Sequence, residues 1–213
     1  MSRKRVRRLM AEEKLCHRLK RRFVRTTQSR RDDVVADNVL DRQFEVGAPD
    51  KVWAGDITYV HTRHGWAYLA AVLDLGSRKV VGWHVAPNME QDLVVRALQQ
   101  ALDQRERELP RGLIHHSDRG TQYTAKTYQE LLAKNDIVCS MSRRGNCWDN
   151  ACVESFFSTL KRELPNDHVF EDWREVERAV FAYVDGFYNT CRPHSALDYC
   201  TPNEYEQREQ AAA

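Results

Sequence analysis

The most informative stretch for the fold is VWAGDITYV (Val52–Val60), which GWAYLAAVLDLGSRKVVGW (Gly65–Trp83) follows after a short turn. Apolar residues occupy both faces of the first segment, and this pattern is typical of a strand that is buried on both sides. Short turns, at 61–65 and at Gly76–Ser77, divide the region into three extended segments. The sequence therefore predicts an antiparallel meander of three strands, at Val52–Val60, Trp66–Leu73 and Val80–Val85.

Helical and extended patterns alternate after the meander. The predicted elements are a helix capped by Asn88 that runs to about Leu109, a strand at Leu113–His115, a helix capped by Thr124, a strand at Ile137–Met141, and helices at Asn150–Glu163 and Trp173–Tyr188. Polar, Gly- and Pro-containing residues 26–51 are interpreted as a linker. The order βββαβαβα plus a closing C-terminal helix predicts an α/β fold built on a five-stranded mixed sheet.

Composition excludes several classes of protein. The chain has 213 residues, of which 42% are hydrophobic, a normal value for a globular protein. Its longest apolar run, Trp66–Leu73, has eight residues, whereas a membrane span needs about 20. No hydrophobic stretch follows the basic N-terminus, so no signal peptide and no membrane association are expected. We expect a cytoplasmic protein whose six cysteines are reduced.

Charge is distributed unevenly along the chain. Residues 1–31 contain thirteen Lys or Arg against Glu12 and Glu13, a net charge of +11, and the remaining residues carry a net charge of −9. Such asymmetry is typical of a cationic arm attached to an acidic body. The arm is either a solvated tail or a segment that binds a polyanion through its phosphates.

Three carboxylates stand in largely apolar surroundings. Asp56 lies in the middle of a predicted strand, Asp118 follows a strand in HHSDRGTQY, and Glu154 lies in the helix NACVESFFSTLK. An ionised carboxylate is costly to bury unless a cation or a hydrogen bond compensates it. Converging Asp and Glu oxygens are the ligands that magnesium prefers, and two such ions can support an in-line phosphoryl displacement.

Other polar residues near these segments receive structural interpretations. Asp74, in LDLGSR, is expected to stabilise a turn. His115 and His116 are adjacent on a strand, so their side chains point to opposite faces and cannot easily bind one metal ion. Asn150 either orients the site or caps the helix that carries Glu154, and capping is favoured. The segment Arg192–His194 either contacts DNA or packs beneath the core, and packing is favoured.

Six motifs occur in order along about two thirds of the chain. They are LDRQF, VWAGDITYV, GWAYLAAVLDLGSRKVVGW, HHSDRGTQYT, SMSRRGNCWDNACVESFFSTLKREL and YNTCRPHSALDYCTP. On these motifs, the segment from Val52 to Pro202 resembles the catalytic core of the retroviral-integrase superfamily. More closely, it is similar to the OrfB subunit of IS-three-type bacterial insertion-sequence transposases.

The resemblance implies an RNase H-like fold and a DNA-recombining enzyme. Asp56, Asp118 and Glu154 would form its acidic catalytic triad, with thirty-five residues between the second and the third. The triad would hold Mg²⁺ (or Mn²⁺), with two ions during catalysis. The implied reaction nicks a transposon end, and the freed 3′-hydroxyl then attacks another phosphodiester. The implied partners are insertion-sequence ends, target DNA and further copies of the chain.

Three cations are candidate DNA-binding residues. Lys161 follows Glu154 by seven residues on the same helical face, and the resemblance assigns such a residue to transposon-end DNA. Arg143 and Arg144 lie beside Gly145 in the loop before that helix. They either contact the DNA backbone or are solvated loop charges.

The domain prediction places a basic N-terminal arm at 1–42 and an integrase-type catalytic core with its C-terminal helix at 43–206. The arm looks like a remnant of a helix-turn-helix region, so recognition of transposon ends could involve a partner subunit from an upstream frame. Two alternatives are a catalytically idle DNA-binding fragment of a decayed element and a hydrolase of RNA–DNA hybrids. The spacing of Asp118 and Glu154 and the segment SMSRRGNCWDNACVESFF argue against the hydrolase.

Overall fold

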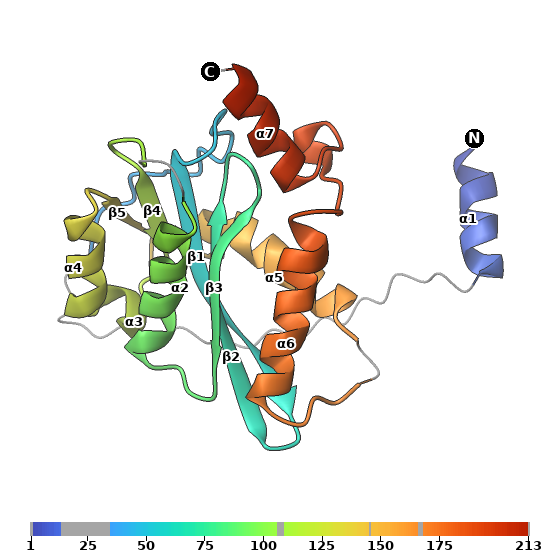
Figure 1. Ribbon diagram of the computed structural model, residues 1–213, viewed down its shortest axis with the longest axis horizontal. Helices are drawn as coiled ribbons and strands as arrows, with labels where there is room; N and C mark the ends of the chain where they lie inside the picture. Colours follow the sequence, from blue (N-terminus) through green and yellow to red (C-terminus); the bar gives the residue numbers. More distant parts are fainter. Residues whose placement is uncertain (1, 14–34, 106–108, 145, 166–167, 213) are drawn as a thin grey trace.

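The computed structural model describes residues 2–13, 35–105, 109–144, 146–165 and 168–212. The described residues from 35 onward are built around a five-stranded sheet (Figure 1). Its strands are β1 (Val52–Thr62), β2 (Gly65–Asp74), β3 (Val80–Ala86), β4 (Ile114–Ser117) and β5 (Val138–Met141). They lie in the order β3-β2-β1-β4-β5. The pairs β1–β2 and β2–β3 are antiparallel, and the pairs β1–β4 and β4–β5 are parallel. The predicted mixed sheet with its meander is confirmed.

Helices cover both faces of the sheet (Figure 1). One face carries α2 (Gln91–Asp103), α3 (Thr121–Thr124) and α4 (Lys126–Lys134), and the other carries α5 (Ala151–Glu163) and α6 (Trp173–Tyr183). A π-helix at Val184–Tyr188 continues α6, and 3₁₀ turns form at Cys147–Asn150 and Ser195–Leu197. The remaining helices are α1 (Arg3–Glu12) and α7 (Pro202–Ala212).

Two hydrophobic cores lie on opposite faces of the sheet, because β1 is apolar on both sides. Val52 and Ala54 pack with α5 and α6, whereas Trp53 and Ile57 pack with α2 and α4. Helix α2 approaches β3 closely, since a Cβ at Gly82 would clash with the α2 backbone. The prediction of a strand buried on both faces is therefore confirmed.

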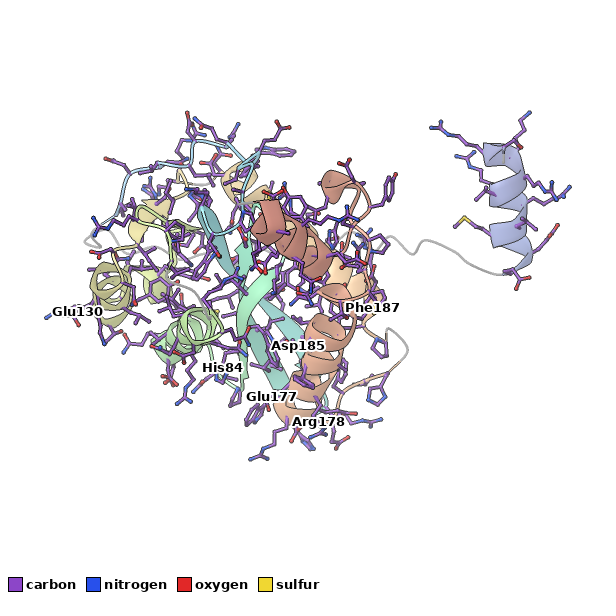
Figure 2. The ribbon with its side chains drawn as sticks, turned by 45° about the horizontal axis from the view of Figure 1, so that its top comes forward. His84, Glu130, Glu177, Arg178, Asp185 and Phe187 are labelled. Carbon is purple, nitrogen blue, oxygen red and sulfur yellow. The ribbon has the colours of Figure 1, made fainter. Side chains whose placement is uncertain are left out.

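The edge strand β3 is covered by the π-helix that follows α6 and by Asn189 directly after it. Asn189 bonds to both the N–H and the carbonyl of Val80, each at 3.0 Å, and so takes the place of a further strand there. The Trp83 indole N–H donates to Asp185 at 3.2 Å. Figure 2 shows Asp185 and Glu177 on the side of the molecule where β3 carries His84. These contacts cover an edge that would otherwise be open for pairing with another strand.

Several predicted helix boundaries are wrong. The residue that caps α2 is Glu90, and Asn88 instead donates a side-chain hydrogen bond to the Glu90 carboxylate at 2.8 Å. Thr124 ends α3, a helix that was not predicted, and α4 begins after Ala125. In both places a polar residue near the helix start was taken for the cap, although the chain turns into the helix slightly later.

The described part of the predicted linker packs on the core. The N–H groups of Val39 and Leu40 donate to the Ser140 hydroxyl at 3.0 and 3.2 Å, and Met141 N–H donates to the Asp37 carbonyl at 3.2 Å. Leu40 is 3% exposed. For residues 35–51 the linker interpretation is therefore wrong. The domain boundary at residue 42 stays a prediction, and residues 14–34 of the arm lie outside the described part of the chain.

A buried ionic cluster fastens α7 to the core. The Arg105 guanidinium lies 2.7 Å from Asp50 and 2.9 Å from Glu206, and Glu206 also accepts from Lys79 at 2.8 Å. Asp74 joins the cluster, 3.8 Å from Arg105. Helix α7 was not predicted, and it extends the core beyond the expected end at residue 206.

Asp74 also has the expected role in a turn. Its carboxylate accepts hydrogen bonds from Gly76 N–H at 3.0 Å and from the Ser77 hydroxyl at 2.7 Å. The four described cysteines, Cys139, Cys152, Cys191 and Cys200, are free thiols, as predicted for them. Within the described ranges, no helix is both long and apolar enough to cross a membrane.

Candidate active site

Asp56 and Asp118 stand side by side at the point where β4 ends. The register pairs Ala54 of β1 with His116 of β4. Asp56 is two residues beyond Ala54, and Asp118 is two residues beyond His116, just past the end of β4. Neighbouring strands lie about 4.8 Å apart, and residues two apart share a face. Because β4 ends at Ser117 while β1 continues to Thr62, the site opens beside the unpaired edge of β1.

Asp118 and Glu154 are both close enough to Asp56 for their charges to change its pKa. Burial raises the pKa of Asp56 well above its usual value, and the negative charge of Asp118 and then that of Glu154 raise it further. The hydrogen bond from Ile57 N–H, at 2.8 Å, lowers the same pKa by more than Glu154 raises it, and the cation of Lys161 lowers it by the smallest amount. Like charges close together favour the protonated acid, or a bound cation that compensates them.

Backbone amides orient the two aspartates. Asp118 accepts from Gly120 N–H at 2.9 Å, and Gly120 has no side chain that would press on this carboxylate. A Cβ at Gly120 would lie 2.9 Å from the same Asp118 oxygen, so the turn after β4 favours glycine there. The loop is tied to its neighbour by Arg119, whose side chain donates to the Ser142 carbonyl at 2.7 Å.

Glu154 is carried in the first turn of α5 and is exposed on its surface. Partial burial raises its pKa. One turn earlier, the Asn150 amide donates to the Gly55 carbonyl of β1 at 3.1 Å, next to Asp56. Asn150 occupies the N-cap position of α5 as predicted, but its side chain makes no capping bond and instead holds the start of α5 against β1. Glu154 is close enough to Asp56 for its negative charge to raise the pKa of that aspartate.

The donor set has the chemistry of a divalent-cation site, although its geometry is open. Carboxylate oxygens are hard ligands that suit Mg²⁺, and burial together with the charge of Asp118 raises the pKa of Asp56, so a bound cation would stabilise its ionised form. Across the residues that the structure describes, no group of three or more His, Cys, Asp or Glu side chains is arranged to hold a metal ion. The pair Asp56–Asp118 and the helix-borne Glu154 are therefore neighbours rather than a closed cluster.

Lys161 lies close to the acidic residues, as its position on α5 predicts. Burial lowers the pKa of Lys161, and the negative charge of Asp56 raises it. Its ammonium nitrogen lies 4.9 Å from the centre of the Tyr59 ring. A cation is thus available beside the site, and its assignment to DNA stays a prediction.

Arg143 is occupied by a buried carboxylate that sequence reasoning missed. Asp149, with a fully buried side chain, accepts from the Arg143 guanidinium at 2.9 Å and from Arg42 at 2.7 Å. Asn38 donates to it at 3.1 Å. These donors hold the pKa of Asp149 far below its usual value, the hydrogen bonds from Arg143 being the largest cause. Arg144 is exposed, and the DNA contacts of both arginines stay predictions.

No local signal reveals this network, because Arg42 and Asp149 are 107 residues apart in the chain. Their motifs, LDRQF and RRGNCWDN, are both in the set quoted above, but a match to a motif does not show which of its charges pair. The network fixes the loop before α5, and with it the position of Glu154.

His115 and His116 are structural, as predicted. His115 bonds to the Tyr128 hydroxyl at 3.0 Å, whereas His116 points to the opposite face between the hydroxyls of Ser140 and Ser142, at 2.9 and 3.0 Å. Burial lowers the pKa of His115 to about 3 and that of His116 to about 4, so both rings are neutral near pH 7. The predicted packing of Arg192 and His194 is also seen, on Tyr188.

The sheet order and the paired acidic residues define a class of proteins, those with an integrase core. The family described as Integrase core domain matches residues 47–147, and a second family of the same description matches residues 135–202. A chain of the simian T-cell lymphotropic virus intasome has a similar fold, with a TM-score of 0.62 and 17% identity over 85% of this chain and 59% of that one. The HTLV-2 integrase catalytic core domain, solved in complex with magnesium, matches with a TM-score of 0.53 and 18% identity over 75% of this chain and 97% of its own. The fold is RNase H-like, as predicted.

Curated relatives narrow the class to a family. The transposase of insertion sequence element IS904 from Lactococcus lactis is 46% identical over 80% of this chain and 66% of its own length. Transposase InsF of IS3A from Escherichia coli K12 is 46% identical over 82% of this chain and 60% of its own length. An insertion element IS600 protein of 31 kDa from Shigella sonnei is 39% identical over 98% of this chain and 76% of its own length. The chain belongs to the IS3 family of insertion-sequence transposases, and it spans 60–66% of the length of the first two relatives.

Proposed function

We propose that the protein is a transposase that cuts and joins DNA, with Asp56, Asp118 and Glu154 as its catalytic carboxylates. One observation carries the proposal. Asp118 comes directly after β4, the parallel neighbour of β1, and its negative charge raises the pKa of Asp56 on β1. A protein gains no stability from two such like charges, whereas a cation-dependent phosphoryl transfer requires them.

Divalent cations, Mg²⁺ or Mn²⁺ and two during catalysis, would supply Lewis acidity to the attacking and leaving oxygens of a phosphodiester. Asp56 and Asp118 would hold them, because backbone N–H groups already orient both carboxylates. Glu154 would complete the set from α5. The Asn150–Gly55 bond keeps the start of that helix on β1, so Glu154 reaches the site by a side-chain movement rather than by a movement of the helix.

The DNA partners in the proposal are insertion-sequence ends and target DNA. Lys161 would contact a phosphate close to the cut, since its cation lies near Asp56. The basic arm, with a net charge of +11 over residues 1–31, would add affinity for any sequence. Further copies of the chain would assemble on the DNA. The comparisons give no support to a partner subunit from an upstream frame, and the proposal does not include one.

The alternative, a catalytically idle DNA-binding fragment, is favoured by one observation. The described carboxylates are not gathered into a metal-binding group of three. The two candidates differ in whether Glu154 can join the aspartates when cation and DNA are present.

Cleavage of DNA that carries the ends of the element tests the proposal, with Mg²⁺ and Mn²⁺ tried in turn. Glu154→Gln keeps the size of the side chain and removes its charge, so we expect it to abolish nicking while DNA binding persists. The matched control is Glu130→Gln, an exposed glutamate on α4 that pairs with Lys126 at 3.5 Å (Figure 2). Cleavage by the Glu154→Gln variant at the parent rate contradicts the triad. A parent protein that binds these ends without cutting them supports the idle fragment.

A further inference from the structure

A row of three aromatic side chains, half-buried at Tyr59 and exposed at His61 and Trp66, begins beside Lys161 and runs along the β1–β2 hairpin. The Lys161 ammonium lies 4.9 Å from the centre of the Tyr59 ring. The Tyr59 ring meets Trp66 edge-on at a centroid distance of 5.0 Å, and His61 meets the same Trp66 at 5.0 Å. We call Lys161, Tyr59, Trp66 and His61 the aromatic strip.

The aromatic strip begins next to the acidic site, across the edge of β1 that β4 leaves unpaired after Ala54. Tyr59 follows Asp56 by three residues, so it lies about 10 Å further along the extended strand and its side chain points to the opposite face. Lys161 links the two, because its charge acts on Asp56 while its ammonium lies over Tyr59. In Figure 1 the hairpin formed by β1 and β2 projects from the sheet beyond the end of β4, so this surface is not covered by the parallel strands.

Packing within the hairpin accounts for only part of this arrangement. His61 and Trp66 are directly opposite each other in the β1–β2 register, and such cross-strand pairs stabilise hairpins. Trp66 nevertheless keeps 47% of its surface exposed. At the hairpin tip, Glu171 pairs with Arg63 at 3.3 Å and with His64 at 3.1 Å. The charge at the tip is therefore balanced, and the cation that the aromatic strip offers is Lys161.

We propose that the aromatic strip binds unpaired nucleotides of the DNA strand that passes through the acidic site. The inference rests on the proposed function, since it concerns the same DNA. Exposed aromatic rings beside a cation are the features with which proteins bind single strands, because bases stack on the rings and phosphates meet the cation. In a duplex the bases are stacked inside the helix, so these rings would select DNA whose strands have separated near the cut.

The length of the aromatic strip suits a few nucleotides. The distance of about 10 Å from Asp56 to Tyr59 corresponds to roughly three stacked nucleotides at 3.4 Å each. A strand with its scissile phosphate at the aspartates would bring its third or fourth base to Tyr59 and Trp66. Lys161, between the two places, would meet an intervening phosphate.

Binding of a fluorescent oligothymidylate of about 12 nucleotides, followed by anisotropy, tests this inference. EDTA prevents cleavage, and about 0.3 M salt suppresses the contribution of the basic arm. Trp66→Leu keeps an apolar side chain against Tyr59 and His61 but removes the ring on which a base stacks. We expect it to weaken binding of the single strand about fivefold or more, and binding of a duplex of equal length by less than twofold.

Two further variants control for folding and for exposed aromatic surface in general. Trp66→Phe keeps an aromatic face and should restore most of the affinity. Tyr199→Leu removes a ring that is 76% exposed on the turn before α7, and it should leave single-strand binding unchanged. The inference is overturned if Trp66→Leu binds the single strand as tightly as the parent, or if Tyr199→Leu binds it as weakly as Trp66→Leu. It is also overturned if the parent has no affinity for the single strand. Nicking is measured in a separate assay. A parent protein that binds the single strand but does not cleave DNA contradicts the proposed function and leaves this inference standing.

Discussion

The molecule contains buried carboxylates in two kinds of surroundings. Asp149 is held by Arg42 and Arg143, and the cluster of Asp50, Asp74 and Glu206 is held by Arg105 and Lys79. Asp56 instead faces Asp118 and Glu154, with Lys161 as the cation whose charge lowers its pKa. The first kind is neutralised within the fold, whereas the second keeps a negative charge that an external cation can neutralise.

Burial alone therefore does not identify a catalytic acid. The pKa of Asp149 lies far below its usual value because arginines donate to it, and the pKa of Asp56 lies far above because burial and like charges act together. Asp74 is intermediate, since burial raises its pKa to about 6 although Ser77 and backbone amides donate to it. The cause of the shift, donors at Asp149 and Asp74 against neighbouring carboxylates at Asp56, separates structural carboxylates from candidate metal ligands.

The largest expected effect comes from removing the cation of a neutralised cluster. Arg105→Ala leaves Asp50 and Glu206 buried without the guanidinium that contacts both of them. Breaking a buried ion pair in this way costs about 3–5 kcal/mol, because charges remain in the interior without compensation. Denaturant unfolding measures the loss. A change below about 1 kcal/mol would show that water reaches the cluster.

A smaller effect is expected at Asp149. Asp149→Asn should cost about 1.5–2 kcal/mol, the lower part of the range for hydrogen bonds to charged groups, because Arg42 and Arg143 are half-exposed and can return to water. The folded-state pKa of Asp149 is depressed, so its contribution is complete above the unfolded pKa of about 4 and is lost as the pH falls below it. Unfolding followed from pH 7 to pH 2 should therefore show a flatter acid limb for the variant.

Removing a charge from the acidic site should stabilise the protein, whereas the two substitutions above destabilise it. Asp56→Asn should raise the free energy of unfolding by about 1 kcal/mol at pH 8, as relief of a strained active site commonly does. Because the folded-state pKa of Asp56 is raised, the ionised carboxylate lowers stability above the unfolded pKa of about 4, and the gain should vanish in acid. Added Mg²⁺ should raise the melting temperature of the parent and not that of the variant. Destabilisation by Asp56→Asn at pH 8 would place Asp56 among the neutralised carboxylates.

The smallest effect is expected at the two loop arginines. Arg144→Ala should change the free energy of unfolding by less than about 0.5 kcal/mol, because the side chain is exposed. Arg143→Ala should cost more, since its guanidinium donates to Asp149. Chemical unfolding and DNA-binding titrations on both variants separate the roles. Equal stability losses would mean that the loop acts as one unit.

Sequence reasoning succeeded where a pattern is local and periodic. The apolar residues on both faces of Val52–Val60 predicted β1 and its two buried faces, and the order of the elements predicted a five-stranded mixed sheet. The grouping of Asp56, Asp118 and Glu154 and the fold family came from the resemblance, which periodicity alone does not supply. The register of β1 and β4 is known only from the structure.

The misses have physical causes that are not local. Asn150 is the N-cap residue of α5, but its side chain makes no capping bond, because a 3₁₀ turn precedes the helix and the amide bonds across to β1. Helix α7 was not predicted because it is held by the ionic cluster at Glu206 rather than by an apolar stripe. Residues 35–51 read as a linker because their contacts with Ser140 lie about 100 positions away in the chain.

The shortness of β4 bears on how copies of such a gene lose activity. Side chains alternate between the faces of a strand, so one codon gained or lost between Leu113 and Asp118 would turn the Asp118 carboxylate away from Asp56. The five-stranded sheet could still form around the shifted strand, since only Ile114–Ser117 is displaced. Such a copy would be translated, fold and bind DNA through its basic arm, yet be silent as an element. In-frame length changes in this stretch are therefore a better marker of extinct copies than substitutions on the surface.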